Sequence, residues 1–194
     1  HIVVCGYGNV GRGVAARARG LGAIVTVVEV DSVKALEAYM EGYNVKKISR
    51  VVENADIFIT CTGQKNVIIE KHFKRMKNGA ILANAGHFDN EIEVEKLISN
   101  SKENYSIRPY LDCYHINGRK IFLLSKGRVV NLVGGEGNPP EVMAMSFANQ
   151  LLSIMHIFKN YQTMQKKVYP VPEKIDSNVA KLSLKYLRIS IDKL

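Results

Sequence analysis

The stretch that most constrains the fold of this chain is an apolar run followed by three closely spaced glycines. Residues 2–5 are of the type that forms a buried strand, and Gly6, Gly8 and Gly11 follow them at G-x-G-x-x-G spacing. The first glycine permits a tight turn, the second lets a pyrophosphate approach the backbone, and the third allows close packing of a helix. A helix over about 10–20 would direct its free N–H groups at the phosphates.

An acidic residue ends the next apolar run, as a dinucleotide-binding unit requires. Residues 24–29 form this second expected strand, and Glu29 lies about 20 residues beyond the glycines. There a carboxylate accepts hydrogen bonds from the adenosine ribose and repels a 2′-phosphate, which favours NAD over NADP. Glycines alone also occur in ordinary turns, so the flanking elements carry the assignment. Asp31 is expected to cap the helix starting near Val33, with Ser32 as the other candidate.

Composition restricts the class of protein further. The 194 residues suffice for one domain with its own core and an appendage, and 46% hydrophobic with 23% charged residues is ordinary for a globular protein. No apolar run is long enough to cross a bilayer, and no signal peptide is visible. The net charge of +9 comes without an aromatic-interleaved basic stripe. We therefore expect a solvated basic surface and neither a nucleic-acid nor a membrane partner.

The cysteines indicate a reducing compartment. Cys5, Cys61 and Cys113 are odd in number and far apart, which argues against a disulfide framework or a metal site. Cys5 and Cys61 fall in strand patterns and are expected to be small core residues. We therefore expect a cytoplasmic protein without metal. Because the chain lacks an initiator Met and opens inside a core strand, we also expect it to be part of a longer protein.

Two further apolar runs end in polar residues. Residues 55–63 predict a buried parallel strand, after which Thr62 and Gly63 are candidates for lining a cofactor cleft, with a plain loop as the alternative. The next expected strand, AILANAG, runs directly into His87 and Asp89. A histidine at this end of a parallel strand can hydrogen-bond or move protons near neutral pH. Taken alone, GHFD is more typical of a loop and a helix cap.

The remaining pattern predicts short elements and a helical end. Helices are expected over 32–41, 49–54, 70–78 and 91–99, with an extended piece near Val45. Alternating strands are expected over 107–116, 119–127 and 128–135, with a hairpin turn at Asn117-Gly118. Amphipathic helices are expected from Pro140 to about 158 and over 175–187. His72 and His115 are expected to face solvent, and His156 to be structural.

Longer strings in this order resemble a known family. GYGNVGRG, EVDSVKALEAYMEGY, TCTGQ, NAGHFDNEIEV, NGRKIFLLSKGRVVNL and the SFANQ helix are similar to the NAD-binding half of the S-adenosylhomocysteine hydrolase (adenosylhomocysteinase) family, in its archaeal and thermophilic branch. The resemblance implies an α/β fold with a Rossmann-type doubly wound parallel sheet over 1–137. Residues 138–194 would be a helical return to the substrate domain or lead into the C-terminal tail, and the full-length protein would be a homotetramer.

The resemblance also implies a set of cofactor-binding residues. These are Gly6, Gly8, Asn9, Val10, Gly11, Arg12 and Gly13 in the glycine turn, Glu29 and Lys34 at the adenosine ribose, Thr62, Gly63, Ala85, Gly86 and His87 on the nicotinamide side, and Asn131 at the carboxamide, with Asn138 as a further candidate. His87 first, and then Asp89, are the residues expected to touch the substrate.

Three of these positions depart from the family pattern. Asn9 stands where Asp is usual, and a turn amide can keep the geometry. Lys34 replaces a common Asn, as in some archaeal and thermophilic members. Asn138 replaces the His of a G-H-P string, which puts one substrate or nicotinamide contact in doubt.

The family reaction is the reversible cleavage of S-adenosyl-L-homocysteine to adenosine and L-homocysteine, a step of the methyl cycle that proceeds through transient oxidation at C3′ of the ribose. Oxidation acidifies the C4′ proton, and its loss expels homocysteine. The family's catalytic Lys, Asp and further His and acidic residues precede the glycine turn, and the tail Lys and Tyr are absent from this chain. We therefore expect this chain to bind NAD but not to turn over by itself.

Other functions of the same cofactor fold are the alternatives. An S-inosylhomocysteine hydrolase of the same family would differ mainly in the substrate domain, on which this chain is silent. A nucleotide-sensing module of a channel or transporter would share the glycine turn but not the GHFDNEIEV string. A 2-hydroxy-acid dehydrogenase would need an Arg, acid and His set that the later loops do not supply.

Overall fold

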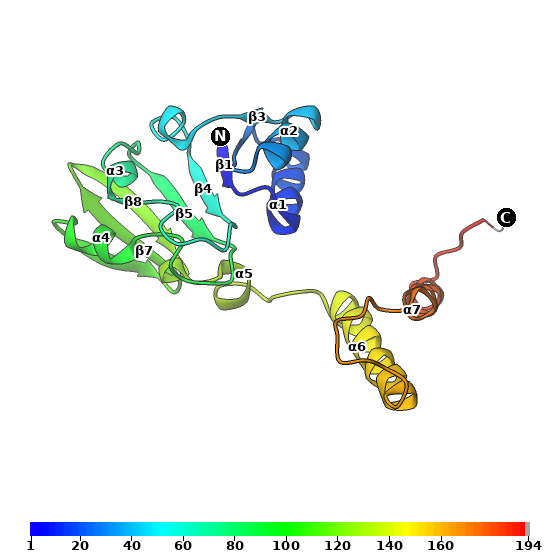
Figure 1. Cartoon of the computed structure of the whole chain (residues 1–194). Coiled ribbons are helices and arrows are strands. Elements are labelled where there is room, and N and C mark those ends of the chain that lie inside the picture. Colours follow the sequence, from blue (N-terminus) through cyan, green and yellow to red (C-terminus); the bar gives the residue numbers. More distant parts are fainter. Residues whose placement is uncertain (193–194) are drawn as a thin grey trace. The chain divides into compact units, whose positions relative to one another are not determined.

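The chain folds into two units. A computed structural model describes residues 1–192, and these divide into a compact unit from His1 to Gly137 and a second unit that begins at Asn138 (Figure 1). The first unit holds a sheet with short helices, and the second holds two longer helices.

An eight-stranded sheet is the centre of the first unit in the part of the chain that the structure describes. Its strands are β1 (Ile2–Cys5), β2 (Val25–Val28), β3 (Asn44–Val45), β4 (Ile57–Thr60), β5 (Ala80–Asn84), β6 (Asn104–Arg108), β7 (Leu111–Ile116) and β8 (Arg119–Leu124). They lie in the order β3-β2-β1-β4-β5-β8-β7-β6, parallel from β3 to β8 and antiparallel at β7 and β6. The order reverses between β1 and β4, the switch point at which doubly wound sheets bind ligands. The α/β prediction is confirmed.

Helices cover this sheet because its strands are apolar on both faces. The helices of the first unit are α1 (Asn9–Gly20), α2 (Ser32–Met40), α3 (Glu70–Phe73), α4 (Val94–Ser99) and α5 (Val130–Val133). Side chains alternate along a strand, so Val3 of β1 joins one apolar cluster with Phe58 and Leu82. Its neighbour Val4 joins a second cluster with Ala15 of α1. Both faces of β1 are therefore core.

Two local predictions are confirmed. The carboxylate of Asp31 accepts hydrogen bonds from the backbone N–H groups of Val33 (2.9 Å) and Lys34 (3.0 Å), so Asp31, and not Ser32, caps α2. The hairpin between β7 and β8 turns at Asn117-Gly118, whose φ values of 50° and 75° are those of a two-residue hairpin turn.

Three other elements differ from expectation. The expected strand over 128–135 is wrong, because residues 130–133 form α5 and only Val129 bridges the sheet, at Asn84. The expected strand over 107–116 divides into β6 and β7 at Tyr110, which has a φ of +65°. The expected helix over 49–54 is a single 3₁₀ turn at Ile48–Arg50.

The predicted exposure of two histidines is wrong. His72 is buried, and its Nδ1 accepts a hydrogen bond of 3.1 Å from the backbone N–H of Ile69 at the start of α3. Burial, reinforced by the charges of Lys71 and Arg75, lowers the pKa of His72 to about 4. His115 is half-buried, with its ring 5.8 Å from that of Tyr105.

The second unit consists of the two helices predicted for it. They are α6 (Pro140–Asn160) and α7 (Glu173–Tyr186), joined by a hydrogen bond of 2.9 Å from Asn149 to the carboxylate of Asp176. The apolar stripe of α6 stays open, with Ile154 64% and Phe158 79% exposed. Among residues 1–192, no helix combines the length and apolarity needed to span a membrane.

Candidate cofactor-binding site

The three glycines after β1 differ in the reason why the position lacks a side chain. Gly6 has a φ of +102°, and a Cβ there would lie 2.9 Å from the carbonyl oxygen of Cys61. A Cβ on Gly11 would collide with the carbonyl of Gly6. A Cβ on Gly8 would meet nothing, and the backbone of Gly8 is extended in a way that any residue adopts. The protein itself therefore requires the first and third glycines, whereas the second leaves a cradle that only a bound group needs.

The start of α1 is open to an anion. Gly8 occupies the cap position and has no side chain to accept the first N–H groups, and the first turn contains no acidic residue. The N–H groups of Asn9, Val10 and Gly11 precede the first intrahelical bond, which runs from Arg12 to Gly8. The positive end of the helix and these donors suit a phosphate.

Arg12 contributes differently from the residues around it. Its guanidinium forms an ion pair with Glu37 of α2 and lies 5.3 Å from the ring centre of Tyr7. Its side chain therefore joins α1 to α2, while the backbone before it remains available. Gly13, one turn into the helix, is exposed, and a Cβ there would meet nothing.

Glu29, directly after β2, is held against the glycine turn. Its carboxylate accepts hydrogen bonds from the N–H groups of Tyr7 (2.7 Å), Val30 (2.6 Å) and Asp31 (3.0 Å). Partial burial opposes ionisation, but these three donors and the charge of Lys34 outweigh it and hold the pKa of Glu29 below its ordinary value. An ionised carboxylate therefore stands beside the turn, with Lys34 exposed on the first turn of α2.

The loop after β4 is held by a residue that the sequence analysis did not single out. The fully buried carboxylate of Glu91 accepts hydrogen bonds from the N–H of Thr62 (2.9 Å), the hydroxyl of Thr62 (2.8 Å) and the N–H of Gly63 (2.8 Å). A glutamate in an N-E-I-E string looks like an exposed helix-start acid, so only its burial reveals this role. The available signal was the apolar residue that follows it: Ile92 is buried.

The loop after β5 depends on Asn84 in the same way. Its side-chain oxygen accepts from the Thr60 hydroxyl (3.0 Å) and the N–H of Gly86 (2.8 Å), and its amide donates to the carbonyls of Phe88 (2.7 Å) and Gly127 (2.9 Å). All its hydrogen-bonding groups are engaged within the protein. The side chain of Asn84 therefore holds together the end of β4, the loop after β5 and the turn at Gly127.

Residues beyond Gly86 face outward. His87 and Asp89 are exposed, and the His87 ring packs edge-on against that of Phe88 at 4.9 Å between centres. A shallow hollow of about 470 Å³ lies at this edge, lined by residues of both loops, Gly63, Gln64, Lys65, Phe88 and Asn90.

Strand register brings most of the predicted residues to one edge. Cys5 pairs with Val28 and with Thr60, and Thr60 pairs with Asn84, so the segments that follow all begin at the same level. The glycine turn, Glu29, the Thr62-Gly63 loop and the segment from Ala85 therefore share the carboxyl edge of the sheet. Asn131, exposed on α5, follows β8, whose carboxyl end lies at the same edge because β8 runs parallel to β5.

Asn138, the further candidate, belongs to the second unit and is its first residue. Its amide lies 3.7 Å from the sulfur of Met143 in the same unit.

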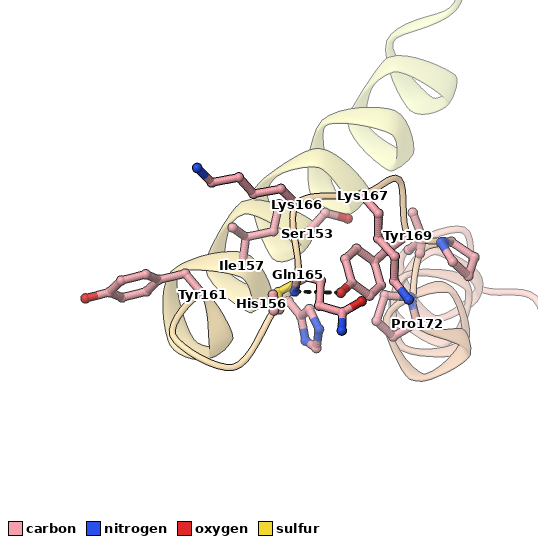
Figure 2. Close-up of a pocket in the computed structure, with 12 residues that line it drawn as sticks. Ser153, His156, Ile157, Tyr161, Gln165, Lys166, Lys167, Tyr169 and Pro172 are labelled. Carbon is pink, nitrogen blue, oxygen red and sulfur yellow. Dashed lines mark hydrogen bonds between the residues drawn. The ribbon is translucent and has the colours of Figure 1, made fainter.

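A pocket in the second unit holds none of the predicted residues. It has a volume of about 400 Å³ and lies between the carboxyl half of α6 and the segment before α7 (Figure 2). Figure 2 shows Tyr169 reaching back across it, where its hydroxyl accepts a hydrogen bond of 2.9 Å from the N–H of Gln165. His156 of α6 also lines it.

Comparison with known proteins assigns the family. The model of the NAD-binding domain of S-adenosyl-L-homocysteine hydrolase matches residues 1–137. The chain belongs to the S-adenosyl-L-homocysteine hydrolase family. Its first unit is thus the NAD-binding domain of that family, and the open cradle at Gly8 with the uncapped start of α1 fits a dinucleotide.

Relatives in the hydrolase family are about half identical to this chain. An adenosylhomocysteinase from Archaeoglobus fulgidus is 47% identical over 193 residues, covering 100% of this chain and 48% of that protein. One from Sulfurisphaera tokodaii is 51% identical over 98% of this chain and 46% of its own length. An S-inosyl-L-homocysteine hydrolase from Methanocaldococcus jannaschii is 50% identical over 100% of this chain and 46% of its own length. The chain spans about half the length of the curated relatives it matches.

Membership in the hydrolase family removes two of the three alternative functions considered from the sequence. It argues against a channel-type sensing module and against a 2-hydroxy-acid dehydrogenase, both of which share only the cofactor fold. It leaves the adenosyl and inosyl activities open, since relatives of both names are similar to this chain to the same degree.

Proposed function

We propose that this chain is the NAD-binding part of an enzyme that reversibly cleaves S-adenosyl-L-homocysteine to adenosine and L-homocysteine. The observation that carries the proposal is the glycine turn, where the space at Gly8 serves no need of the protein itself and Glu29 is anchored beside it. Family membership supplies the chemistry to which this geometry is put. The enzyme would work in the cytoplasm as a homotetramer.

In this proposal the adenosine half of the cofactor is held by the first βαβ segment. The N–H groups at the start of α1 receive the pyrophosphate, with the backbone of Asn9 and Val10 against it. The ionised Glu29 accepts hydrogen bonds from the ribose hydroxyls, and its charge disfavours a 2′-phosphate. Lys34 flanks the ribose from the first turn of α2.

The nicotinamide half would lie along the carboxyl ends of β4 and β5. Thr62, Ala85, Gly86 and His87 line that side, and Asn131 receives the carboxamide. Bound NAD+ would supply the oxidant for C3′ of the substrate ribose. His87 and Asp89 are exposed at this edge, so their side chains are free to contact a substrate delivered by another part of the enzyme.

The rest of the enzyme is needed for turnover. We propose that residues 1–137 form the cofactor domain and that the helices from residue 138 belong to the substrate domain or lead to the tail. Because the chain spans about half of its relatives, it is expected to bind NAD without hydrolysing S-adenosylhomocysteine.

A calorimetric titration of the purified chain with NAD+ tests the binding step. The expected result is saturable binding of NAD+ with weaker binding of NADP+, and no release of homocysteine from S-adenosylhomocysteine. Absence of NAD+ binding would contradict the assignment of the site, and hydrolysis by this chain alone would contradict the need for a separate substrate domain.

An S-inosyl-L-homocysteine hydrolase is the second candidate. The relative from Methanocaldococcus jannaschii, which bears that name, is 50% identical to this chain. The two activities differ at the purine base, which the proposed cofactor site does not contact. Release of homocysteine by the full-length enzyme from the adenosyl and the inosyl thioether, measured side by side, separates the two functions.

A further inference from the structure

One buried carboxylate joins the two loops predicted to carry the nicotinamide. Glu91 is fully buried between them. One of its oxygens, Oε2, accepts from both the N–H and the hydroxyl of Thr62, and the other, Oε1, accepts from the N–H of Gly63. The first of these loops, after β4, therefore takes its position from a side chain of the second.

The backbone around Glu91 repeats this connection. The carbonyl of Glu91 accepts hydrogen bonds from the N–H groups of Val67 (2.8 Å) and Ile68 (3.0 Å), and Ile68 and Ile92 form a parallel bridge. The two segments thus run side by side. From the second of these segments, the side chain of Glu91 points toward the carboxyl edge of the sheet, where it meets Thr62 and Gly63.

The carboxylate also explains a glycine in the second loop. A Cβ on Gly86 would run into the carboxylate of Glu91 and would lie 3.0 Å from the side-chain oxygen of Asn84. The protein therefore requires glycine at position 86 to make room for Glu91. The backbone of Gly86 thus lies close to the same carboxylate that holds Thr62-Gly63.

A carboxylate satisfies all of these donors, whereas an amide of the same shape does not. The N–H groups of Thr62 and Gly63 point at different oxygens, so both oxygens must accept. A glutamine would set an NH₂ group against one of the two N–H groups. The carboxylate also affects the neighbouring thiol. Burial, and after it the charge of Glu91, raises the pKa of Cys61 to about 12.

We propose that Glu91 is a positioning residue that fixes Thr62-Gly63 and Gly86 in the arrangement that receives the nicotinamide half of the cofactor. The inference rests on the proposed function, because it requires NAD to lie along this edge. It concerns one half of the dinucleotide only, because the side-chain hydrogen bonds of Glu91 go to Thr62 and Gly63 and not to the glycine turn or Glu29, which are proposed to hold the adenosine half.

Paired titrations test this division. The 194-residue chain and its Glu91→Gln variant are each titrated with NAD+ and with ADP-ribose, which lacks the nicotinamide. Since a buried N–H left facing another donor is costly, the variant is expected to bind NAD+ about tenfold or more weakly. Its affinity for ADP-ribose should stay within about twofold. Glu93→Gln is the matched control, because Glu93 also accepts a backbone N–H, that of Glu70 (2.9 Å), but away from Thr62.

Each other outcome has a defined meaning. Equal losses for NAD+ and ADP-ribose, or no loss for either, would overturn the positioning role. Failure of the unsubstituted chain to bind either compound would overturn the proposed function, and this inference with it. Glu91→Asp, which keeps the charge but shortens the reach, should show the same selective loss. If thermal unfolding shows that neither variant folds, Glu91 serves the fold as a whole and the inference is wrong.

Discussion

The carboxylate of Glu29 accepts a hydrogen bond of 2.7 Å from the backbone N–H of Tyr7, across the gap between β2 and the glycine turn after β1. The end of the second strand is thereby tied to the first turn. Two more donors, at Val30 and Asp31, keep the carboxylate ionised. An anion whose position is set by three backbone groups is well suited to distinguish a ribose hydroxyl from a phosphate.

Glu29→Gln should therefore change the choice of cofactor. Loss of the charge removes repulsion of the 2′-phosphate, so the preference for NAD+ over NADP+ is expected to fall about tenfold or more. Titration of the variant with both nucleotides measures the ratio. Asp31→Asn is the control, because asparagine can also cap α2 and should leave the ratio unchanged. An unchanged ratio in the Glu29 variant would refute the role assigned to this carboxylate.

Two glycines of the turn should give opposite results when each is changed to alanine. Gly8→Ala is expected to cost at most about 1 kcal/mol of stability, since its Cβ meets nothing, but to weaken NAD+ binding strongly. Gly11→Ala is expected to cost about 3 kcal/mol, because its Cβ collides with the carbonyl of Gly6. Urea unfolding and NAD+ titration of both variants check the contrast. Equal stability losses would show that the space at Gly8 is not a ligand cradle.

His72 should make the stability of the first unit depend on pH. Its pKa falls from 6.5 to about 4 on folding, so below pH 6.5 the unfolded chain binds a proton that the folded chain does not. The free energy of unfolding should therefore fall by up to about 3 kcal/mol between pH 6.5 and pH 4, and be insensitive to this group above pH 6.5.

The matched variant for this experiment is His72→Gln. Glutamine at this position can still accept the N–H of Ile69, as in a capping box, but does not titrate. Urea unfolding at several pH values between 7 and 4 gives the comparison. If both proteins lose stability in parallel over this range, the histidine is not the titrating group.

Asn84→Asp should loosen the segments that follow β5. The substitution keeps the acceptor for Thr60 and Gly86 but places a carboxylate oxygen against the carbonyls of Phe88 and Gly127. A loss of about 3 kcal/mol is expected, because a buried carbonyl and a partly buried one lose their donor and face a carboxylate oxygen instead.

Asn78→Asp provides the comparison for this variant. The Asn78 oxygen accepts the N–H of Lys120 at 2.8 Å, and aspartate retains it, so its stability should change little. Thermal unfolding distinguishes the two variants. Similar melting temperatures for both would mean that the amide of Asn84 contributes nothing beyond its acceptor.

Sequence patterns predicted the parts of this fold that depend on local chemistry. The glycine turn, the cap at Asp31 and the Asn117-Gly118 hairpin each follow from what a short stretch of backbone allows, and the structure contains all three. The strand predicted over 128–135 was wrong because the alternation of apolar and polar residues in this run is typical of a strand, although residues 130–133 of the run form α5. In the structure Ser125 and Lys126 take positive φ values, and the chain leaves the sheet, so that of that run only Val129 bridges to it.

The residues that sequence reasoning missed are polar groups whose burial is set by distant segments. His72 lies among Lys71, Lys74 and Arg75, so its surroundings in the sequence suggest exposure, yet its ring turns inward to cap α3. Glu91 contacts a loop nearly thirty positions earlier in the chain, at Thr62 and Gly63. No local pattern encodes such a partner, because the contact exists only once β4 and β5 are paired.

Cys5, Thr60 and Asn84 are paired in register at the ends of three neighbouring strands. This register limits where the domain can gain or lose residues. Adding one residue inside β4 would turn every later side chain of that strand to the opposite face and lift its loop out of reach of Glu91. The same addition in an exposed turn far from this edge, such as Asn117-Gly118, would leave the three strand ends flush. We therefore expect proteins that keep this cofactor edge to vary in length at the opposite rim and in the outer connections.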